Sequence, residues 1–424
     1  MRIGDTAHLT RDELLGYFLR AATPRADWRV GMEIETIGHD MRSGDVLPYD
    51  GDGPSVRRVL ECLEARRGGS PILEGVHRIG INGEWGTISL EPGGQVEWSS
   101  RPLATLDLLA DELQAHLDAL AECGEAAGVR WVPFGVDPDL PVTALRWMPK
   151  ARYGIMRPYL NARGRLAARM MGQTASIQSS FDFAGPEDFR RKFKAAALLD
   201  PVAVALFANS ARADGGPTGL RSYRQAIWNE TDPARCGMPA ALFEADFALE
   251  AWLDYVLAVP AMFLHRGRGL VPAGGVPFAE LLARTGCSAA QLADWETHLS
   301  TIFTEARAYT YIEVRGADLQ PDELAFAVPA LWTGILYQND ALDAALHLAR
   351  RVGRHDAWTA ALASAARDGL DGSFGDLAMR DAAREMIDLA TAGLRNGAAC
   401  AGTGRSGLDA LDRLAAHHAL GGTP

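Results

Sequence analysis

The sequence predicts an α+β protein in which one sheet is backed by helices. Four segments alternate apolar and polar residues with the two-residue period of a strand, at 28–38, 95–99, 174–183 and 309–318. Helical segments lie between them, and from Asp322 onward the chain is rich in Ala and Leu and reads as mostly helical. No Pro- or Ser-rich linker divides the 424 residues, so we expect one domain over 1–424, with 322–424 as its helical C-terminal part.

Composition places the chain among ordinary globular proteins. Hydrophobic residues make up 48% and charged residues 23%, and the formal net charge is −12. This charge, without basic runs, argues against a nucleic-acid or anionic-membrane binder. The five cysteines form no C-x-x-C pair, and the first residues lack an apolar signal core. We therefore expect a soluble, cytoplasmic protein without a zinc cage or a disulfide framework.

Local signals place the elements of the first part of the chain. Thr10 and Glu13 have the spacing of a capping box, which predicts a helix that starts at Thr10. The next expected elements are a strand at 28–38, helices at 52–67 and 102–127 with a turn at 81–83 between them, and, at 129–138, a strand that leaves into a Pro-rich loop. A short helix at 151–157 should stop near Pro158, because the residue before a proline disfavours helical angles.

The later part continues the same pattern. After the strand at 174–183 we expect a helix from Glu187 to Ala208. The segment 214–239 is rich in Gly, Pro, Asn and Asp, which predicts a long ordered loop or lid. The remaining expected elements are helices at 241–264 and 288–307, the strand at 309–318, and a frayed tail at 417–424.

The strands share one feature, which is a polar face. Residues two apart on a strand point to the same side. The polar positions are Glu33 and Glu35, then Gln95 and Glu97, then Gln178, Ser180 and Asp182, and finally Tyr311, Glu313 and Arg315. A solvated sheet face explains one such strand, but Glu and Gln are depleted in strands, so the whole set favours another explanation.

Clustered carboxylates repel one another and favour a bound cation. Mg²⁺ or Mn²⁺ suits this face because hard cations bind carboxylate and amide oxygens. Zinc fits poorly, since no His or Cys lies on these strands. In the stretch SLEPGGQVEWSS, Glu91 and Glu97 are therefore predicted metal ligands, and Gly93 and Gly94 would let the backbone approach a ligand closely.

Arginines complement the acidic face. They are Arg152, Arg157, Arg221, Arg224, Arg235 and Arg315. One arginine alone is more often part of a surface ion pair, but a metal face with converging arginines is what phosphoryl transfer from ATP requires. The chain has no GxxxxGK[ST] loop, no GxGxxG after a strand and no legible Ser-His-Asp pattern.

At these residues the sequence resembles the plant and bacterial glutamate–cysteine ligases, a group that includes the actinobacterial enzymes of ergothioneine synthesis. The segments that carry the resemblance are, in order, GMEIET, SLEPGGQVEWSS, MPKARYGIM, MMGQTASIQ, LFANS, IWNETDPARCG, DWETHLSTIF and YIEVRGAD. It runs from about residue 10 to 340. It implies a single catalytic domain with the glutamine synthetase-like carboxylate–amine ligase fold, whose curved, largely antiparallel sheet forms a funnel backed by helices.

The resemblance also implies a reaction and roles for individual residues. The expected activity is ATP-dependent ligation of glutamate to an amine such as cysteine through a γ-glutamyl phosphate, in thiol biosynthesis, with Mg²⁺ or Mn²⁺ as cofactor. The implied metal ligands are Glu33, Glu35, Glu97 and Glu313, together with Gln178 and Glu91. Glu313 and Arg315 would be catalytic, Arg235 would hold the glutamate α-carboxylate, Trp228 would wall the pocket, and Arg152 and Arg157 would be further substrate contacts.

Some positions depart from the plant pattern. Ile34 replaces a His, Ser180 an Asn and Met262 a Tyr, while Asn229 and Glu230 replace Thr and Asp. Because the metal and phosphoryl positions are intact, these changes point to the acceptor side, with Ser180 and Met262 as candidate substrate contacts. The disulfide switch of plant enzymes is not expected here, since the cysteines give no legible pair.

Three other functions remain open at this point. The first is the same γ-glutamyl ligation to a different amine in a specialised pathway. The second is a metal-dependent hydrolase, which would use the carboxylates to activate water. The third is a non-catalytic binding protein, which would be expected to lose at least one metal ligand. Oligomeric state has no signal in the sequence.

Overall fold

The structure is a computed structural model that describes residues 9–267, 269–284 and 290–420. At its centre lies an antiparallel sheet in the order β12-β13-β7-β1-β5-β4-β3-β2, with β6 also paired to β1. The strands are β1 (Val30–Asp40), β2 (Ser70–Glu74), β3 (His77–Gly83), β4 (Gly86–Leu90), β5 (Val96–Ser100), β6 (Val129–Val132), β7 (Ser176–Phe181), β12 (Ala306–Ala308) and β13 (Ile312–Asp318). Three small hairpins lie apart from it: β8 (Arg212–Ala213) with β9 (Gly216–Pro217), β10 (Phe263–Arg266) with β11 (Gly269–Pro272), and β14 (Ser373–Phe374) with β15 (Leu377–Ala378).

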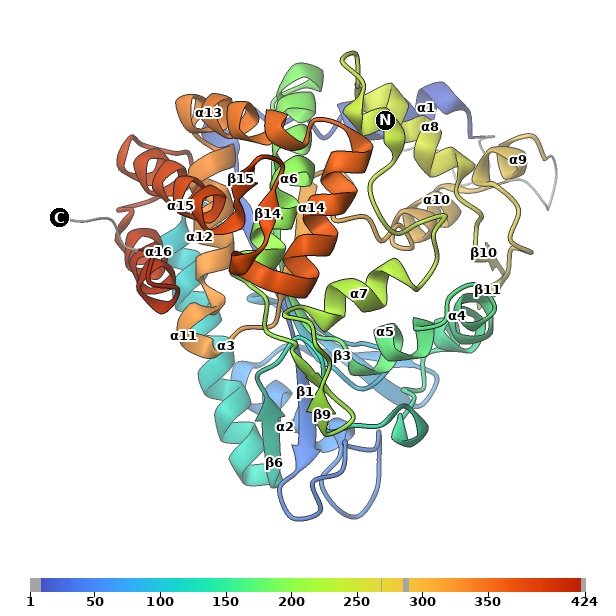
Figure 1. Ribbon diagram of the computed structural model, residues 1–424. Coiled ribbons are helices and arrows are strands. Elements are labelled where there is room, and N and C mark those ends of the chain that lie inside the picture. Colours follow the sequence, from blue (N-terminus) through green and yellow to red (C-terminus); the bar gives the residue numbers. More distant parts are fainter. Residues whose placement is uncertain (1–8, 268, 285–289, 421–424) are drawn as a thin grey trace.

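Helices surround this sheet. They are α1 (Arg11–Leu19), α2 (Val56–Arg67), α3 (Leu106–Ala127), α4 (Ala151–Asn161), α5 (Ala167–Gln173), α6 (Pro186–Leu206), α7 (Tyr223–Asn229), α8 (Leu249–Ala258), α9 (Phe278–Leu282), α10 (Leu292–Leu299), α11 (Asp322–Ala325), α12 (Ala327–Leu336), α13 (Asn339–Ala349), α14 (His355–Asp368), α15 (Met379–Arg395) and α16 (Arg405–His417). In Figure 1 the C-terminal helices gather at the upper left, whereas α4 and α5 lie on the opposite side. Among the described residues, no helix is long and apolar enough to cross a membrane.

The two faces of the sheet differ as the alternation predicts. On β1, Met32 and Ile34 are buried among apolar side chains, while Glu33 and Glu35 point to the other face. Helices α3, α6 and α12 contact the strands. On the apolar face, Trp98 stacks on His116 of α3 with ring centroids 5.0 Å apart. The polar face is therefore left free to form a site.

The C-terminal helices are packed into the same core. All ten residues of α12 are buried, which is the pattern of a helix surrounded on every side. It contacts β1 and β7 of the sheet as well as α13, α15 and α16. Residues 322–424 are mostly helical where the structure describes them, as predicted.

Several local predictions are confirmed, and two in the first part of the chain are wrong. Thr10 caps α1 with Glu13 in a capping box. The predicted turn at 81–83 is instead the end of β3, and the turn follows it. Helix α4 continues through Pro158 to Asn161. Proline removes only one helical hydrogen bond, and burial of Tyr153 and Leu160 on one face holds the helix on both sides of it.

Three later segments also differ from prediction. The expected loop at 214–239 contains α7, because Ser222 accepts a hydrogen bond from the backbone N–H of Gln225 and caps a new helix. Of the expected helix at 241–264, only α8 from Leu249 to Ala258 is α-helical, and the chain then enters β10. The expected helix at 288–307 is only α10, followed by β12. Residues 1–8, 285–289 and 421–424, including the end of the predicted frayed tail, lie outside the described residues.

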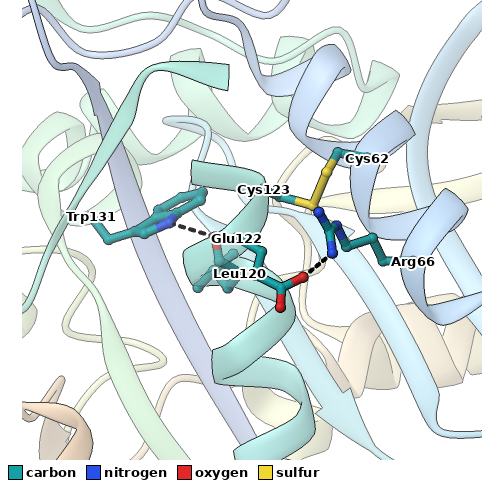
Figure 2. Close-up of a disulfide and its surroundings, with 6 residues drawn as sticks. All are labelled: Cys62, Arg66, Leu120, Glu122, Cys123 and Trp131. Atoms are coloured by element: carbon teal, nitrogen blue, oxygen red, sulfur yellow. Dashed lines mark hydrogen bonds and ion pairs between the residues drawn. A yellow bond between two sulfur atoms is a disulfide. The ribbon is translucent and has the colours of Figure 1, made fainter. Parts of the chain in front are cut away.

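A disulfide joins Cys62 of α2 to Cys123 of α3 (Figure 2), contrary to the expectation from the scattered cysteines. The two residues are 61 apart in the sequence, yet helix packing brings their Cα atoms to 5.7 Å. An ion pair between Arg66 and Glu122 lies beside the bond, and the Trp131 indole donates to the carbonyl of Leu120 at 2.9 Å. Sequence spacing could not show this pairing, because it arises from contact between two helices.

Candidate active site

A cavity of about 210 Å³ opens on the polar face of the sheet. Its acidic and amide side chains come from β1, β5, β7 and the turn between β4 and β5. Its lining comprises Glu33, Glu35, Glu91, Pro92, Gln95, Glu97, Arg152, Tyr153, Met156, Met170, Met171, Thr174, Gln178, Trp228, Ser300, Phe303, Arg307, Tyr309 and Arg315. The structure thus brings together most of the residues that the sequence singled out.

Strand register sets the order of the acids. Glu35 of β1 stands directly opposite Glu97 of β5, and Glu33 stands opposite Gln178 of β7. Serine hydroxyls donate to three of the carboxylates: Ser99 to Glu33 at 3.1 Å, Ser176 to Glu35 at 2.8 Å and Ser89 to Glu97 at 3.2 Å. Like charges directly opposite each other destabilise a sheet, so this arrangement costs stability unless a cation or protons neutralise it.

The raised pKa values of these glutamates show this cost. Burial, followed by repulsion from Glu313, raises the pKa of Glu33 to about 7. Burial and then Glu91 raise the pKa of Glu35 to about 7. The pKa of Glu97 is raised well above its ordinary value by burial and by Glu33. The protonated form of all three carboxyl groups is therefore favoured over its ordinary population when no other positive charge lies among them.

The acidic and amide side chains of the cavity, which we call the acidic row, are suitable ligands for a hard cation, because their donor atoms are carboxylate and amide oxygens. In the part of the chain that the structure describes, no three acid, imidazole or thiol side chains already surround a single point as a ligand set would. The residues in the cavity that would hold the ion are Glu33, Glu35, Glu91, Glu97 and Gln178. Glu313 does not line the cavity itself, but it contacts Arg307 and Arg315, which do.

Two arginines face the acids from β12 and β13. The Arg307 guanidinium lies 2.7 Å from Oε2 of Glu313, and Nη1 of Arg315 lies 2.9 Å from the same oxygen. Arg315 also donates to the amide oxygen of Gln178. Glu313 is thus held between two cations, and both guanidinium groups are fixed at the wall of the cavity.

The PGG turn has a structural role that the sequence did not reveal. The amide of Gln95, which is buried, donates to the carbonyl of Thr174 at 2.8 Å, and its oxygen accepts from the N–H of Gly93 at 2.9 Å. A Cβ on Gly93 would lie 2.5 Å from the carbonyl oxygen of Gly172. Gly93 therefore allows the turn to touch the backbone of α5, and not a ligand. The hydrogen bonds of Gln95 hold the turn in place and so keep Glu91 beside the cavity.

The predicted substrate contacts divide into two groups. Arg152 and Trp228 line the cavity, and buried nitrogens of both, Nε of Arg152 and Nε1 of Trp228, have no hydrogen-bond partner. Arg157 is exposed outside it and stacks on Trp147 at 4.7 Å. Met262 is buried in the core, apart from the cavity lining.

Arg235, expected to hold the glutamate α-carboxylate, is fully buried and saturated. Its Nε donates to Asp232 at 2.7 Å, and its Nη1 donates to the carbonyl and hydroxyl oxygens of Thr301, both at 3.0 Å. Its Nη2 donates to Tyr159 at 2.9 Å and to the carbonyl of Pro260 at 2.6 Å. No donor is left for a ligand in this arrangement, because a guanidinium has five N–H groups.

Some lining residues were not predicted. Arg307 stands directly opposite Glu313 in the strand pairing, but the sequence reading placed 288–307 in a helix and so concealed it. Tyr309 also lines the cavity, and burial raises the pKa of its hydroxyl to about 12. Short apolar–polar alternation in EARAYTY is the signal that could have extended the strand predicted at 309–318 back to Arg307.

A second cavity of about 270 Å³ adjoins the first. It shares Glu33 with the first cavity, and its wall includes Arg29, Ser180, Asp182 and Tyr311. Ser180 therefore lines this second cavity, and in the strand pairing it stands opposite Glu313. Asn229 and Glu230 lie outside both walls; Asn229 accepts from Gln225, and Glu230 pairs with Arg165 at the surface.

Comparisons with known proteins agree with this arrangement. The model of a family described as Glutamate-cysteine ligase family 2 matches residues 29–423. The chain is 36% identical over 398 residues to the chloroplastic glutamate–cysteine ligase of Brassica juncea, with 92% of this chain and 76% of that protein covered. The corresponding protein of Arabidopsis thaliana is 36% identical over 403 residues, with 92% and 74% covered.

A solved structure gives the same answer for the fold. The glutamate–cysteine ligase of Francisella tularensis in complex with AMP matches with a TM-score of 0.50 at 14% identity, and the match covers 91% of this chain and 81% of that one. At this identity the likeness concerns the fold alone. The predicted α+β carboxylate–amine ligase fold is confirmed.

Proposed function

Because the chain belongs to the glutamate–cysteine ligase family, we propose that it is an ATP-dependent ligase that joins the γ-carboxylate of glutamate to the amino group of cysteine. The observation that carries this proposal is the meeting of acids and arginines in one cavity. Glu33 and Glu35 lie in the same cavity as Arg307 and Arg315. Phosphoryl transfer depends mainly on positioning and on electrostatic stabilisation, which is what such a wall supplies.

The reaction has two steps. First, an oxygen of the glutamate γ-carboxylate attacks the γ-phosphorus of ATP, and ADP leaves with the electrons of the broken P–O bond. Then the amine attacks the acyl carbon of the γ-glutamyl phosphate, inorganic phosphate leaves, and the amine loses a proton. Arg307 and Arg315 would stabilise negative charge on the transferring group, because Glu313 holds both guanidinium groups in place before the substrate arrives.

We propose Mg²⁺ or Mn²⁺ as the cofactor, held by Glu33, Glu35, Glu91, Glu97, Gln178 and Glu313. Two observations support this proposal. The donors are all oxygen atoms, and the pKa values of Glu33 and Glu35 are raised, as expected where too few positive charges lie near the carboxylates. When bound, the ion would supply positive charge that offsets the charge of the acids and of the nucleotide phosphates.

For glutamate, the candidate α-carboxylate contact is Arg152. Its side chain lines the cavity, donates to the Ser300 hydroxyl at 3.3 Å and keeps the buried Nε without a partner. Every donor of Arg235 is already engaged within the protein. Arg235 therefore has a supporting role, because it binds Thr301, the neighbour of the Ser300 that contacts Arg152. For the nucleotide, the second cavity offers an approach to Glu33 from another side.

Cysteine is the favoured acceptor because part of the cavity wall suits a thiol. Met156, Met170, Met171 and Phe303 line it together with Trp228. A thiol forms only weak hydrogen bonds, and polarizable or aromatic neighbours receive it well. Such a wall separates acceptors of similar size by only about 1–3 kcal/mol, so the same ligation with a different amine is the second candidate.

An amine panel tests the proposal. The protein is incubated with ATP, glutamate, Mg²⁺ and one amine from cysteine, 2-aminobutyrate, serine or a simple alkylamine, and γ-glutamyl products are identified by mass spectrometry. We expect γ-glutamylcysteine with one ADP and one phosphate per product. If cysteine and 2-aminobutyrate are inert while an alkylamine reacts, the specialised ligase is correct. If no amine is ligated and no ADP forms with any of them, ligase function is excluded.

A further inference from the structure

Arg315 sits at an irregular point of β13. Between Val314 and Ala317 the pairing with β7 shifts by one residue, so that Arg315 and Gly316 together stand opposite the single residue Gln178. This is a β-bulge, in which the regular ladder of backbone hydrogen bonds is interrupted. Buried carbonyl groups at such a point need other donors, since an unpaired one costs free energy.

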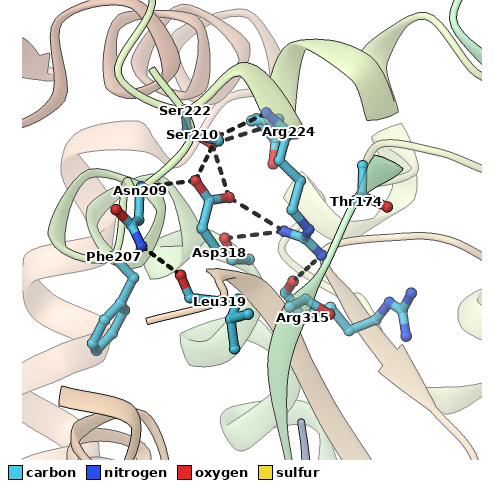
Figure 3. Close-up of polar contacts among 12 residues, drawn as sticks. Thr174, Phe207, Asn209, Ser210, Ser222, Arg224, Arg315, Asp318 and Leu319 are labelled. Carbon is cyan, nitrogen blue, oxygen red and sulfur yellow. Dashed lines mark hydrogen bonds and ion pairs between the residues drawn. The ribbon is translucent and has the colours of Figure 1, made fainter. Parts of the chain in front are cut away.

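Arg224 supplies those donors from α7. Its side chain is only 3% exposed. Its Nη2 donates to the carbonyl oxygen of Arg315 at 3.1 Å, and its Nη1 reaches the carbonyl oxygen of Gly316 at 3.5 Å. One guanidinium fork therefore spans both peptides of the bulge (Figure 3).

Asp318 holds Arg224 in this position. Its Oδ1 lies 3.8 Å from Nη1 of Arg224. The same carboxylate accepts hydrogen bonds from the backbone N–H of Asn209 at 2.8 Å and from the hydroxyls of Ser210 at 2.6 Å and Ser222 at 3.1 Å. Ser210 also accepts from the backbone N–H of Arg224 at 3.0 Å, so the start of α7 is tied to β13 through several contacts (Figure 3).

The bulge is also packed tightly at its glycine. A Cβ added to Gly316 would lie 2.1 Å from Oδ1 of Asp200, a fully buried residue of α6. The backbone at Gly316 is thus pressed against α6, while the Arg224 fork holds the two carbonyls. In contrast, Arg224 is not among the residues that line the first cavity, which holds the acids.

We propose that Arg224 is a positioning residue for the proposed ligase reaction: by clamping both peptides of the bulge, it sets the direction in which Arg315 enters the cavity. This inference rests on the proposed function. Arg224 acts through Arg315, whose guanidinium contacts Gln178 and Glu313 inside the site. Arg221, three residues earlier, is 62% exposed at the surface and provides a matched control.

Kinetics of Arg224→Lys and Arg221→Lys test the clamp. Lysine keeps the charge but not the fork, so we expect kcat of Arg224→Lys to fall about 10–100-fold, because small displacements of a catalytic group have effects of this size. The KM values for ATP and glutamate should stay within about threefold, since ground-state contacts are untouched. Arg221→Lys should behave as wild type. A raised KM with normal kcat would overturn the proposal.

A double-mutant cycle separates positioning from general stability. In an Arg315→Ala background, Arg224→Lys should lower kcat no further, because the residue through which it acts is gone. Equal fold-losses in both backgrounds would show that Arg224 only stabilises the fold and would overturn the proposal. Asp318→Asn, which removes the charge that holds Arg224, should show the same lack of additivity with a smaller effect.

A third measurement does not depend on activity. Amide hydrogen exchange over residues 312–318 should be faster in Arg224→Lys than in Arg221→Lys or wild type, because the bulge loses its clamp. Unchanged exchange in a folded Arg224→Lys protein would overturn the inference. If wild type makes no product with any amine, the proposed function fails instead, and exchange still reports on the clamp.

Discussion

At the scale of single residues, the structure gives Arg235 a structural role and leaves Arg152 as the arginine that can bind a ligand. Arg235 looked like a ligand-binding arginine in a loop, but all of its donors are bound within the protein. Arg152 lines the cavity and retains a buried nitrogen without a partner. Burial of a saturated arginine indicates a structural centre, whereas an unsatisfied buried donor beside a cavity indicates a place for a ligand.

Substitution should separate these two arginines. We expect Arg152→Ala to raise the glutamate KM about tenfold or more and to leave the ATP KM nearly unchanged, because a charge-assisted contact contributes roughly 1.5–3 kcal/mol. Arg157→Ala, on the same helix but outside the cavity, is the matched comparison and should have little effect. Steady-state kinetics with each substrate varied in turn provides the measurement.

Arg235→Lys should instead reduce stability. Breaking a buried ion pair typically costs about 3–5 kcal/mol, and lysine cannot replace five donors. Thermal unfolding should show a lower Tm for Arg235→Lys than for Arg152→Ala. A variant with normal Tm and a selectively raised glutamate KM would restore Arg235 as the α-carboxylate contact.

The raised pKa values in the acidic row predict an unusual pH dependence of the stability of the folded chain. Glu33 and Glu35 have pKa values of about 7 in the folded chain against an ordinary value of 4.5, because of burial and neighbouring acids. The folded state therefore binds more protons than the unfolded state between these two pH values, and stability should fall as pH rises through this window. Tm measured in EDTA should decrease by several degrees from the acidic to the neutral end.

Variants and metal provide the controls for this effect. Glu35→Gln should flatten the pH dependence in EDTA, whereas Glu125→Gln on the exposed side of α3 should not. Above neutral pH, Mg²⁺ should raise the Tm of wild type and raise that of Glu35→Gln much less, because the ion replaces the lost protons. Equal effects of Mg²⁺ on both proteins, together with full ligase activity in excess EDTA, would contradict the metal assignment.

At the scale of elements, the disulfide fastens α2 to α3 beside the sheet that carries the acids. A Cβ on Gly94, in the turn that holds Glu91, would lie 3.4 Å from Val56 at the start of α2. Helix α3 contacts β1 and β5 directly. The Cys62–Cys123 bond therefore stabilises the two helices that flank the acidic strands.

Loss of the disulfide should lower stability without removing the site. Closing a loop of 61 residues stabilises the folded chain by about 4 kcal/mol in the loop-entropy account. Dithiothreitol should lower the urea midpoint of wild type and leave that of a Cys62→Ser, Cys123→Ser double variant unchanged. If dithiothreitol does not alter the wild-type midpoint, the bond is absent in solution.

At the scale of the whole molecule, the C-terminal helices complete the core of the sheet. Helix α12 is buried on all sides and contacts β1, so strands that carry Glu33 and Glu35 depend on a segment far along the chain. This packing is the physical basis for expecting residues 1–424 to behave as one domain.

Calorimetry and truncation test this unity. We expect one thermal transition, with calorimetric and van't Hoff enthalpies that agree. A chain shortened to residues 1–321 should fail to fold, because the apolar surface that α12 covers would be exposed to water. Two separate transitions, or a soluble and folded 1–321 fragment, would show that the helical part is a separate domain.

The sequence alone determined the features that repeat locally. Strand alternation placed Glu33, Glu35 and Glu97 on one face, and this was confirmed because side-chain direction along a strand depends only on its period of two. The family segments likewise predicted the α+β ligase fold, which the structural comparison confirms.

Tertiary structure decided everything that depends on contacts between distant segments. Strand register placed Arg307 opposite Glu313, helix packing joined Cys62 to Cys123, and the surroundings of Arg235 used up its donors. None of these has a local pattern, because each depends on which residues meet after the chain has folded. The acids of the site and Arg315 could therefore be predicted from their own strands, whereas the roles of Arg307 and Arg235 were decided only by their neighbours in space.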